Sequence, residues 1–380
     1  GIAAIILGYA DEVVDNAVIE QISRGNCFAI NHELEVELAE ELVNLIPCAE
    51  MVRYAKCGGE ACSIAVRIAR GATGRDRILF CGYHGWHDWY LAANLDAAGA
   101  LNQHLFSGIE PIGVPQALSE TSVPFPYGDV NALGELLDRY KGTVAAIIME
   151  PCRTEHPPEG YLQAVRKLAD EHDVVLIFDE VSTGFRHGVD GVQTVLGVVP
   201  DLAVFAKSIS NGYPMGCVVG KRDVMESASR MFISSTYWSD TIGMRAALTT
   251  LREIRRRNVP QQLHQFGARL QQEINKVAAD TGAPVECYGV EVHPSLRFSP
   301  ADPADMQKIS TLYVQEMAKR GCHGYPSFYL NAAQGEAEMQ QTLAAAAEVF
   351  TILRETSESG DWDAKLECEL RTDAFQRLVK

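Results

Sequence analysis

Residues 201–214 read DLAVFAKSISNGYP, an apolar run that closes on a lysine and then breaks into a Ser/Asn/Gly/Pro turn. Burying an ammonium group is costly unless the group has a partner or a chemical purpose. Lys207 therefore has two interpretations. It is either a surface lysine at a strand end, or an amine held in a dry cleft so that it loses its proton and attacks a carbonyl. The sequence on either side of this stretch has to decide between them.

Further apolar runs lie on both sides of this stretch, most of them followed by a helical or loop pattern. They are RILFC (77–81), VAAIIME (144–150), DVVLIFDE (173–180) and CVVG (217–220). Unbroken aliphatic runs are typical of strands buried on both faces, so the sequence predicts an α/β fold with a largely parallel sheet. Functional residues of such sheets lie at the carboxyl ends of strands, where this chain carries Glu150, Asp179 and Lys207.

The length of 380 residues, 47% of them hydrophobic, allows more than one domain. The sequence begins with Gly and not Met, so we expect residues 1–35 to be the remainder of an N-terminal segment whose start is missing. Residues 36–250 are expected to form a large domain. Long amphipathic helices around strand-like sequence predict a smaller α+β domain over 251–380.

Composition excludes several classes of protein. The formal net charge is -17, from 50 acidic and 33 basic side chains, which argues against a general affinity for nucleic acid. The apolar opening GIAAIIL is too short to span a membrane and lacks the basic start of a signal peptide. The 10 cysteines include no CxxC pair and lack the dense spacing of a disulfide scaffold. We therefore expect a cytoplasmic protein with reduced thiols that binds neither nucleic acid nor a membrane.

Two motifs near the first strands offer ligand groups. In KCGGEA (56–61), two glycines open a predicted helix, so that free amides can approach a phosphate, although a plain turn is the commoner explanation. In CGYHGWHDW (81–89), Tyr83 offers a flat face for a heteroaromatic ligand. The histidines and aspartate of this second motif suggest a metal only weakly, because the ligand set is incomplete, and a polar loop is the alternative.

Asp179 closes a dry strand, and a charge there must have a partner. That partner is either a structural arginine or backbone turn, or a cationic ligand nitrogen. A phosphate cradle, a stacking ring, a carboxylate for a ring nitrogen and a desolvated amine together match the needs of pyridoxal 5′-phosphate (PLP), whose ring acts as an electron sink. The sequence thus indicates PLP as the cofactor.

The order of motifs also resembles a known family. It runs through ILGYADEVVDNAVIEQ, ELAEELV, GGEACSIAVRIARGATGRDRI, GYHGWHDWY, PYGDVNAL, AAIIMEP, LIFDEVSTGFR and PDLAVFAKSISNGYPMGCVVGKRDVM. This order resembles the class III aminotransferases, in the branch that contains glutamate-1-semialdehyde aminomutase. The resemblance is close over residues 7–251. It implies the PLP-dependent transferase fold (fold type I), with a mostly parallel seven-stranded sheet in a large PLP-binding domain.

The resemblance also implies roles for single residues. Lys207 resembles the Schiff-base lysine and proton shuttle, and Asp179 the partner of the pyridinium nitrogen. Val181 resembles the residue that packs on the cofactor face opposite Tyr83. Thr236 resembles the threonine that reaches the phosphate of a neighbouring subunit, which implies a homodimer with shared active sites.

The cofactor set implied by the resemblance also includes Gly58, Gly59, Glu60, Glu150 and Ser182. The phosphate loop departs from the family pattern Ser-Gly-Thr-Glu-Ala, because Cys57 and Gly59 replace the two hydroxyl residues. Backbone amides must therefore contribute more of the binding. Ser182 stands where the family often has Gln or Met.

The segments PCRTEHPPEGYLQAVR and FISSTYWSD resemble aminotransferases of polysaccharide and sugar-acid biosynthesis. This implies transfer of an amino group from an amino acid, glutamate, to an aldehyde or ketone such as a 3-deoxy-octulosonate-type sugar acid. Arg153 and Arg297 are candidates for binding a substrate carboxylate, although structural salt bridges explain them equally well.

Three rival functions remain. The nearest is a glutamate-1-semialdehyde-type 2,1-aminomutase with the same cofactor, which needs no external donor. The second is a family member that binds PLP or a partner protein without turnover. The third is a metal hydrolase built on His84, His87 and Asp88.

Overall fold

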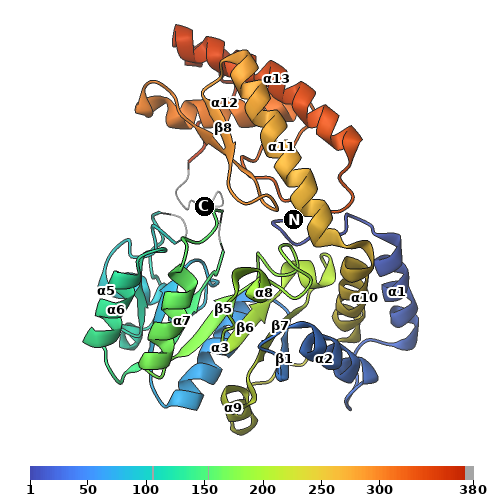
Figure 1. Ribbon diagram of the computed structural model, residues 1–380, viewed down its shortest axis with the longest axis vertical. Helices are drawn as coiled ribbons and strands as arrows, with labels where there is room; N and C mark the ends of the chain where they lie inside the picture. The colour runs from blue at the N-terminus through green and yellow to red at the C-terminus, as the bar shows by residue number, and fades with distance from the viewer. Residues whose placement is uncertain (105–106, 153, 373–380) are drawn as a thin grey trace. The chain divides into compact units, whose positions relative to one another are not determined.

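Figure 1 shows the computed structural model, which describes residues 1–104, 107–152 and 154–372. These residues form two compact units. Unit 1 contains the described residues up to 152 and residues 157–260, and unit 2 contains 154–156 and 261–372. The boundary expected near residue 250 falls within helix α10 (Thr241–Arg257), which belongs to unit 1.

A seven-stranded sheet forms the centre of unit 1 (Figure 1). Its strands are β1 (Met51–Ala55), β2 (Arg77–Cys81), β3 (Ser122–Pro124), β4 (Val144–Met149), β5 (Val175–Asp179), β6 (Leu202–Phe205) and β7 (Gly216–Gly220). The strand order is β1-β7-β6-β5-β4-β2-β3. Strand β7 runs antiparallel to both of its neighbours, and the remaining described pairs are parallel. The predicted mostly parallel seven-stranded sheet is therefore confirmed.

Two of these strands were not among the predicted runs. Strand β1 has the sequence MVRYA and is mostly half-buried, so it lacks the unbroken apolar pattern of the central strands. Strand β3 has only three residues and ends on a proline. Both lie at the edges of the sheet, where burial on two faces is not required.

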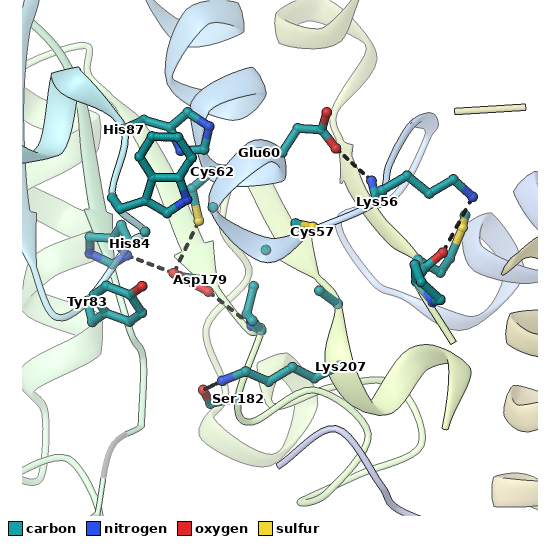
Figure 2. Close-up of a pocket in the computed structure, with 18 of the residues that line it drawn as sticks. Lys56, Cys57, Glu60, Cys62, Tyr83, His84, His87, Asp179, Ser182 and Lys207 are labelled. Carbon is teal, nitrogen blue, oxygen red and sulfur yellow. Dashed lines mark hydrogen bonds and ion pairs between the residues drawn. The ribbon is translucent and has the colours of Figure 1, made fainter. Parts of the chain in front are cut away.

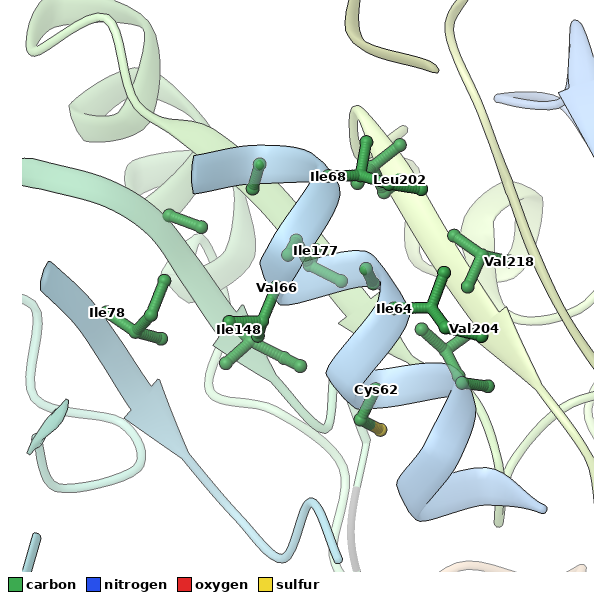
Figure 3. Packing of buried hydrophobic residues seen from close by; sticks show 14 of the residues in the cluster. Cys62, Ile64, Val66, Ile68, Ile78, Ile148, Ile177, Leu202, Val204 and Val218 are labelled. Carbon is green, nitrogen blue, oxygen red and sulfur yellow. The ribbon is translucent and has the colours of Figure 1, made fainter. Parts of the chain in front are cut away.

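Helix α3 (Gly58–Thr73) packs across the sheet. Its apolar positions recur three and four residues apart, which gives it one buried stripe, and it ends at Gly74 with φ 66°. Figure 3 shows this stripe against the strands, where Ile64 and Ile68 of the helix join a cluster with Ile148, Ile177, Val204 and Val218. Each such side chain contributes about 1.5 to 3 kcal/mol by burial. This packing fixes the first turn of α3 over the sheet.

Unit 1 contains further α-helices. They are α1 (Glu12–Arg24), α2 (Glu33–Leu45), α4 (Asp88–Leu91), α5 (Ala93–Asp96), α6 (Val130–Arg139), α7 (Tyr161–Glu171), α8 (Gln193–Leu196), α9 (Arg222–Met225) and α10. Among the described helices, none combines the length and the apolar character that a membrane span requires.

The first residues of the chain are bound to the turn that follows β6. The side-chain oxygen of Asn211 accepts hydrogen bonds from the backbone N–H groups of Ile6 (3.0 Å) and Leu7 (2.9 Å). Its amide nitrogen donates to the carbonyl of Gly8 at 2.9 Å. The hydroxyl of Ser208 donates to the carbonyl of Ala3 at 3.2 Å. The N-terminal segment thus supports the turn that carries Lys207.

Unit 2 has the expected α+β composition. Strands β8 (Val285–Tyr288) and β9 (Ser295–Phe298) form an antiparallel pair. The helices are α11 (Val259–Thr281), α12 (Met306–Lys319), α13 (Glu336–Ser359) and α14 (Trp362–Lys365).

Candidate active site

A cavity of about 360 Å³ lies in unit 1, at the carboxyl ends of four adjacent strands and beside the first turn of α3. The strands β6, β5, β4 and β2 are neighbours, so the residues that follow them meet at one edge of the sheet. The predicted site residues that line the cavity are Gly58, Gly59, Glu60, Tyr83, Glu150, Asp179, Val181, Ser182 and Lys207. The structure thus brings together most of the residues that the sequence assigned to one site.

Lys207 begins a short 3-10 helix directly after β6 and has a φ of 52°, in the left-handed region. A lysine in that conformation is uncommon, and such strain is concentrated at functional sites. Its Nζ donates to the hydroxyl of Ser182 at 2.8 Å (Figure 2). Burial lowers the pKa of Lys207, and the nearby carboxylates of Asp179 and Glu150 oppose that shift. The amine is therefore easier to deprotonate than a surface lysine.

Asp179, 3% exposed, is held by three contacts at the end of β5. Its Oδ2 lies 2.7 Å from Nδ1 of His84 and accepts a weak hydrogen bond from the thiol of Cys62 at 3.3 Å. Its Oδ1 accepts from the backbone N–H of Val181 at 3.0 Å. Figure 2 shows both side-chain contacts converging on the carboxylate. Among the described residues its ion-pair partner is a histidine and not an arginine or lysine, which leaves it suited to a cationic ligand nitrogen.

His84 and Cys62 are functional candidates that sequence reasoning did not connect with Asp179. His84 is 1% exposed, and its Nε2 has no hydrogen-bond partner among the described residues. Its ring stacks on Trp89, with centroids 6.4 Å apart and an interplanar angle of 18°. A histidine that follows a strand end, in a sheet whose nearby strand ends on an aspartate, is a signal that could have identified this pair.

The metal alternative on His84, His87 and Asp88 is not the arrangement that the structure favours. Within the described residues, the clustered donor atoms belong instead to Cys62, His84 and Asp179, all within 4.8 Å of one another. The hydrogen bonds on the carboxylate of Asp179 account for this cluster.

The first turn of α3 presents backbone to the cavity. A Cβ at Gly58 would lie 2.8 Å from Cγ1 of Val181, and a Cβ at Gly59 would lie 3.2 Å from Cα of Gly85. Only glycine fits at position 58 without a shift of the chain, whereas a Cβ at position 59 would make a tight contact. The first amides of a helix have no acceptor within the helix. Glu60 helps to fix the turn, because it accepts from the backbone N–H of Lys56 at 2.7 Å. The turn therefore fits a phosphate bound by amides.

Tyr83 follows β2 and is 42% exposed. Its backbone N–H donates to the carboxylate of Glu150 at 3.1 Å, and its ring packs edge-on against Tyr90 with centroids 6.0 Å apart. Burial is the main cause that raises the pKa of Tyr83, so the phenol remains neutral at physiological pH. The residue thus offers an uncharged aromatic face to the cavity.

Among the described residues, Thr236 and Arg297 are not part of the lining of this cavity. Thr236 is exposed in a turn of unit 1. In unit 2, Arg297 pairs with Glu286 (3.1 Å) and Glu155 (3.3 Å) and stacks over Tyr288. Arg153 lies outside the described residues.

Residues 1–287 match the model of the family described as Aminotransferase class-III. The chain belongs to the class III aminotransferases. It is 35% identical over 335 residues to the 3-aminobutyryl-CoA aminotransferase of Cloacimonas acidaminovorans (strain Evry), covering 84% of this chain and 77% of that protein. It is 34% identical over 378 residues to the glutamate-1-semialdehyde 2,1-aminomutase of Ignicoccus hospitalis, covering 93% and 87%. The branch inferred from the sequence is therefore confirmed.

Solved structures agree with this assignment. An omega-transaminase from Sphaerobacter thermophilus superposes on this class III aminotransferase with a TM-score of 0.82 at 27% identity, covering 93% of this chain and 85% of that one. The PLP internal aldimine form of the FumI protein of Sphingopyxis sp. MTA144 gives a TM-score of 0.83 at 26% identity, covering 93% and 83%. The fold is that of PLP-dependent transferases of fold type I, and PLP is the cofactor.

Proposed function

We propose that this class III aminotransferase holds PLP in the cavity of unit 1 and moves an amino group from glutamate to a carbonyl acceptor. The observation that carries the proposal is that Lys207 and Asp179 line the same cavity. Burial lowers the pKa of Lys207, while Asp179 lacks a partner with a permanent positive charge among the described residues. PLP-dependent amino transfer requires an amine that can lose its proton and a carboxylate that can bind the protonated ring nitrogen.

The residues present would contact the ring nitrogen, both faces of the ring and the phosphate of the cofactor. Asp179 would pair with the ring nitrogen, and Tyr83 and Val181 would cover the two faces. The amides of Gly58 and Gly59 would bind the phosphate. When bound, PLP supplies an electron sink for the negative charge that develops at the substrate carbon.

Lys207 is the residue proposed to attach the cofactor and, once free, to move the substrate proton. As a neutral amine it would accept the proton from the α-carbon of the donor and, in the reverse half of the reaction, would deliver a proton to the carbonyl carbon of the acceptor that receives the amino group. Ser182 would hold Nζ during this step, since its hydroxyl already accepts from it at 2.8 Å. Glu150 would support the stacking ring through the backbone of Tyr83.

For the acceptor we propose a sugar or sugar acid of the 3-deoxy-octulosonate type. The support is the likeness of the segments at 151–166 and 232–240 to sugar-acid aminotransferases. One relative is named a 3-aminobutyryl-CoA aminotransferase, so keto acyl-CoA compounds belong in the same screen. Arg297 is proposed to bind the acceptor carboxylate, for which it would have to exchange at least one of its two glutamate partners. Arg153 remains a second proposed contact.

We also propose a homodimer in which Thr236 reaches the cofactor phosphate of the other subunit. Its exposure within unit 1 supports this role, because a side chain directed to a partner is exposed in the single chain.

The second candidate function is a glutamate-1-semialdehyde 2,1-aminomutase. Relatives that are 33% to 38% identical carry that name. An aminomutase isomerises its substrate without an external donor, so the two functions differ in their need for glutamate.

A donor half-reaction separates the two functions. The protein is loaded with PLP, and its visible absorption is followed while single amino acids are added. We expect glutamate to bleach the cofactor band and to yield 2-oxoglutarate in equal amount, and we expect Lys207→Ala to abolish this reaction. If no amino acid reacts but glutamate-1-semialdehyde is isomerised, the aminomutase is the correct function.

A further inference from the structure

The phosphate end of the cavity has lost its usual side-chain donors. The family pattern has Ser and Thr where this chain has Cys57 and Gly59. Cys57 precedes α3 but makes no side-chain hydrogen bond to the first turn of that helix. Lys56 and Cys57 line the cavity, but the ammonium of Lys56 pairs with Asp240 at 2.9 Å and a thiol is a weak donor. A stronger side-chain donor to the phosphate therefore has to come from a neighbouring segment.

His87, in the loop between β2 and α4, occupies the side of the turn from which the threonine side chain is missing. A Cβ at position 59 would lie 3.4 Å from both Nδ1 and Cε1 of the His87 ring. A Cβ at this distance already touches the ring, and a threonine carries two further heavy atoms, so any rotamer that turns one of them toward His87 would press on the ring. Gly59 and His87 thus form a matched pair, in which the absence of one side chain makes room for the other.

The Nδ1 atom of His87 makes no hydrogen bond to any described residue. It is also shielded from solvent. His87 is the N-cap of α4, yet its side chain makes no capping hydrogen bond. Trp86 stacks on the ring with centroids 4.7 Å apart and an interplanar angle of 17°, which fixes the plane of the imidazole. A buried polar atom without a partner is costly and needs an explanation.

We propose that Nδ1 of His87 donates a hydrogen bond to the phosphate of PLP and so replaces the hydroxyl that Gly59 removes. His87 and Gly59 both line the cavity (Figure 2 shows His87 beside α3). The inference rests on the proposed binding of PLP there. A hydrogen bond to a phosphate oxygen is charge-assisted, and its loss weakens affinity roughly 10-fold to 100-fold.

Pyridoxal, which lacks the phosphate, provides the matched ligand for the test. Dissociation constants for PLP and pyridoxal are measured by absorption titration for the whole protein and for the His87→Ala and His87→Asn variants. We expect His87→Ala to weaken PLP binding about 10-fold or more, to leave pyridoxal binding within about twofold, and His87→Asn to recover part of the loss. The two dissociation constants are compared as a ratio within each variant. A general loss of stability changes both constants alike and therefore leaves this ratio unchanged. His156→Ala, in unit 2, is the control and is expected to change neither constant.

A double substitution tests the matched pair directly. Gly59→Thr alone is expected to weaken PLP binding, because the new side chain meets the His87 ring. Gly59→Thr combined with His87→Ala restores the family arrangement and is expected to bind PLP more tightly than either single variant.

Three results would overturn the inference. The first is equal PLP affinity in the wild type and His87→Ala. The second is an equal loss for PLP and pyridoxal. The third is binding of inorganic phosphate that depends on His87 while PLP affinity does not, which would indicate a site for a free anion. Failure of the wild type to bind PLP through Lys207 would instead refute the proposed function.

Discussion

The two ends of the cavity are built in different ways. At the end proposed to hold the cofactor ring, here called the ring end, the carboxylate of Asp179 is fixed by contacts with His84, Cys62 and the backbone of Val181. At the end proposed to bind the phosphate, the absence of side chains at Gly58 and Gly59 leaves the backbone of α3 close to Val181 and Gly85. Ligand binding at the ring end should therefore depend on side-chain contacts. Binding at the phosphate end should depend on the lack of side chains at two positions. The two ends should respond differently to substitution.

The largest effect is expected from removing the charge at the ring end. Asp179→Asn keeps the shape but cannot hold a protonated ring nitrogen, so we expect the rate of the donor half-reaction to fall about 1000-fold or more, which corresponds to about 4 kcal/mol. PLP should still bind. Single-turnover absorption kinetics measure the rate, and Asp170→Asn on the surface of α7 is the control. A loss of less than about tenfold would remove Asp179 from the proposed role.

The second effect concerns the phosphate end. Gly58→Ala places a Cβ 2.8 Å from Cγ1 of Val181, so the turn must shift, and we expect PLP affinity to fall about 10-fold to 100-fold. The rate of the loaded enzyme should change much less than in Asp179→Asn. Absorption titration gives the affinity. Gly134→Ala is a control, because a Cβ there meets nothing within 4 Å. Equal affinity in Gly58→Ala and the wild type would show that the close approach is not needed.

The third effect is on stability near the ring end. Burial raises the pKa of Glu180 to about 8, so the folded state binds its proton more tightly than the unfolded chain does. This contribution to stability is present at low pH and is lost as pH rises through 8. We expect the free energy of unfolding to fall on the order of 1 to 2 kcal/mol between about pH 6 and 8. Urea titrations at several pH values test this.

Glu180→Gln cannot ionise, so its stability profile over the same pH range should be flatter than that of the wild type. If the two profiles are parallel, Glu180 does not titrate in this range.

The smallest effect is expected from Cys62. Its thiol is a weak donor to a carboxylate that keeps two other contacts, so Cys62→Ala should slow the half-reaction only about twofold to tenfold. Cys62→Ser, which retains a donor, should lose less. The comparison with Asp179→Asn by the same kinetics shows whether the ring end depends on the carboxylate alone. A loss as large as that of Asp179→Asn would mean that Cys62 has a chemical role of its own.

The predictable part of the molecule is the part in which neighbouring residues in the sequence determine the outcome. The apolar runs that end at Asp179 and Lys207 predicted central strands, because burial on two faces leaves an unbroken pattern. The edge strand at 51–55 was missed, since one of its five residues is an arginine and only the last is buried. The family motifs similarly indicated the cofactor and the fold.

The contacts between distant segments were not predictable in this way. His84 and Asp179 are 95 positions apart, and their contact depends on the strand order of the sheet. The proximity of the His87 ring to Gly59 can be recognised only in the folded structure. The roles of Thr236, Arg153 and Arg297 remain predictions.

The anchoring of residues 6–8 to Asn211 has a consequence for folding. The hydrogen bonds to Ile6, Leu7 and Gly8 join positions 203 to 205 residues apart. Contacts of such long sequence separation form slowly, because the loop between them must first be ordered. We therefore expect the turn that carries Lys207 to become complete late during folding. During synthesis, residues 6–8 cannot bind Asn211 until Asn211 has left the ribosome. Until then the turn that carries Lys207 lacks this support.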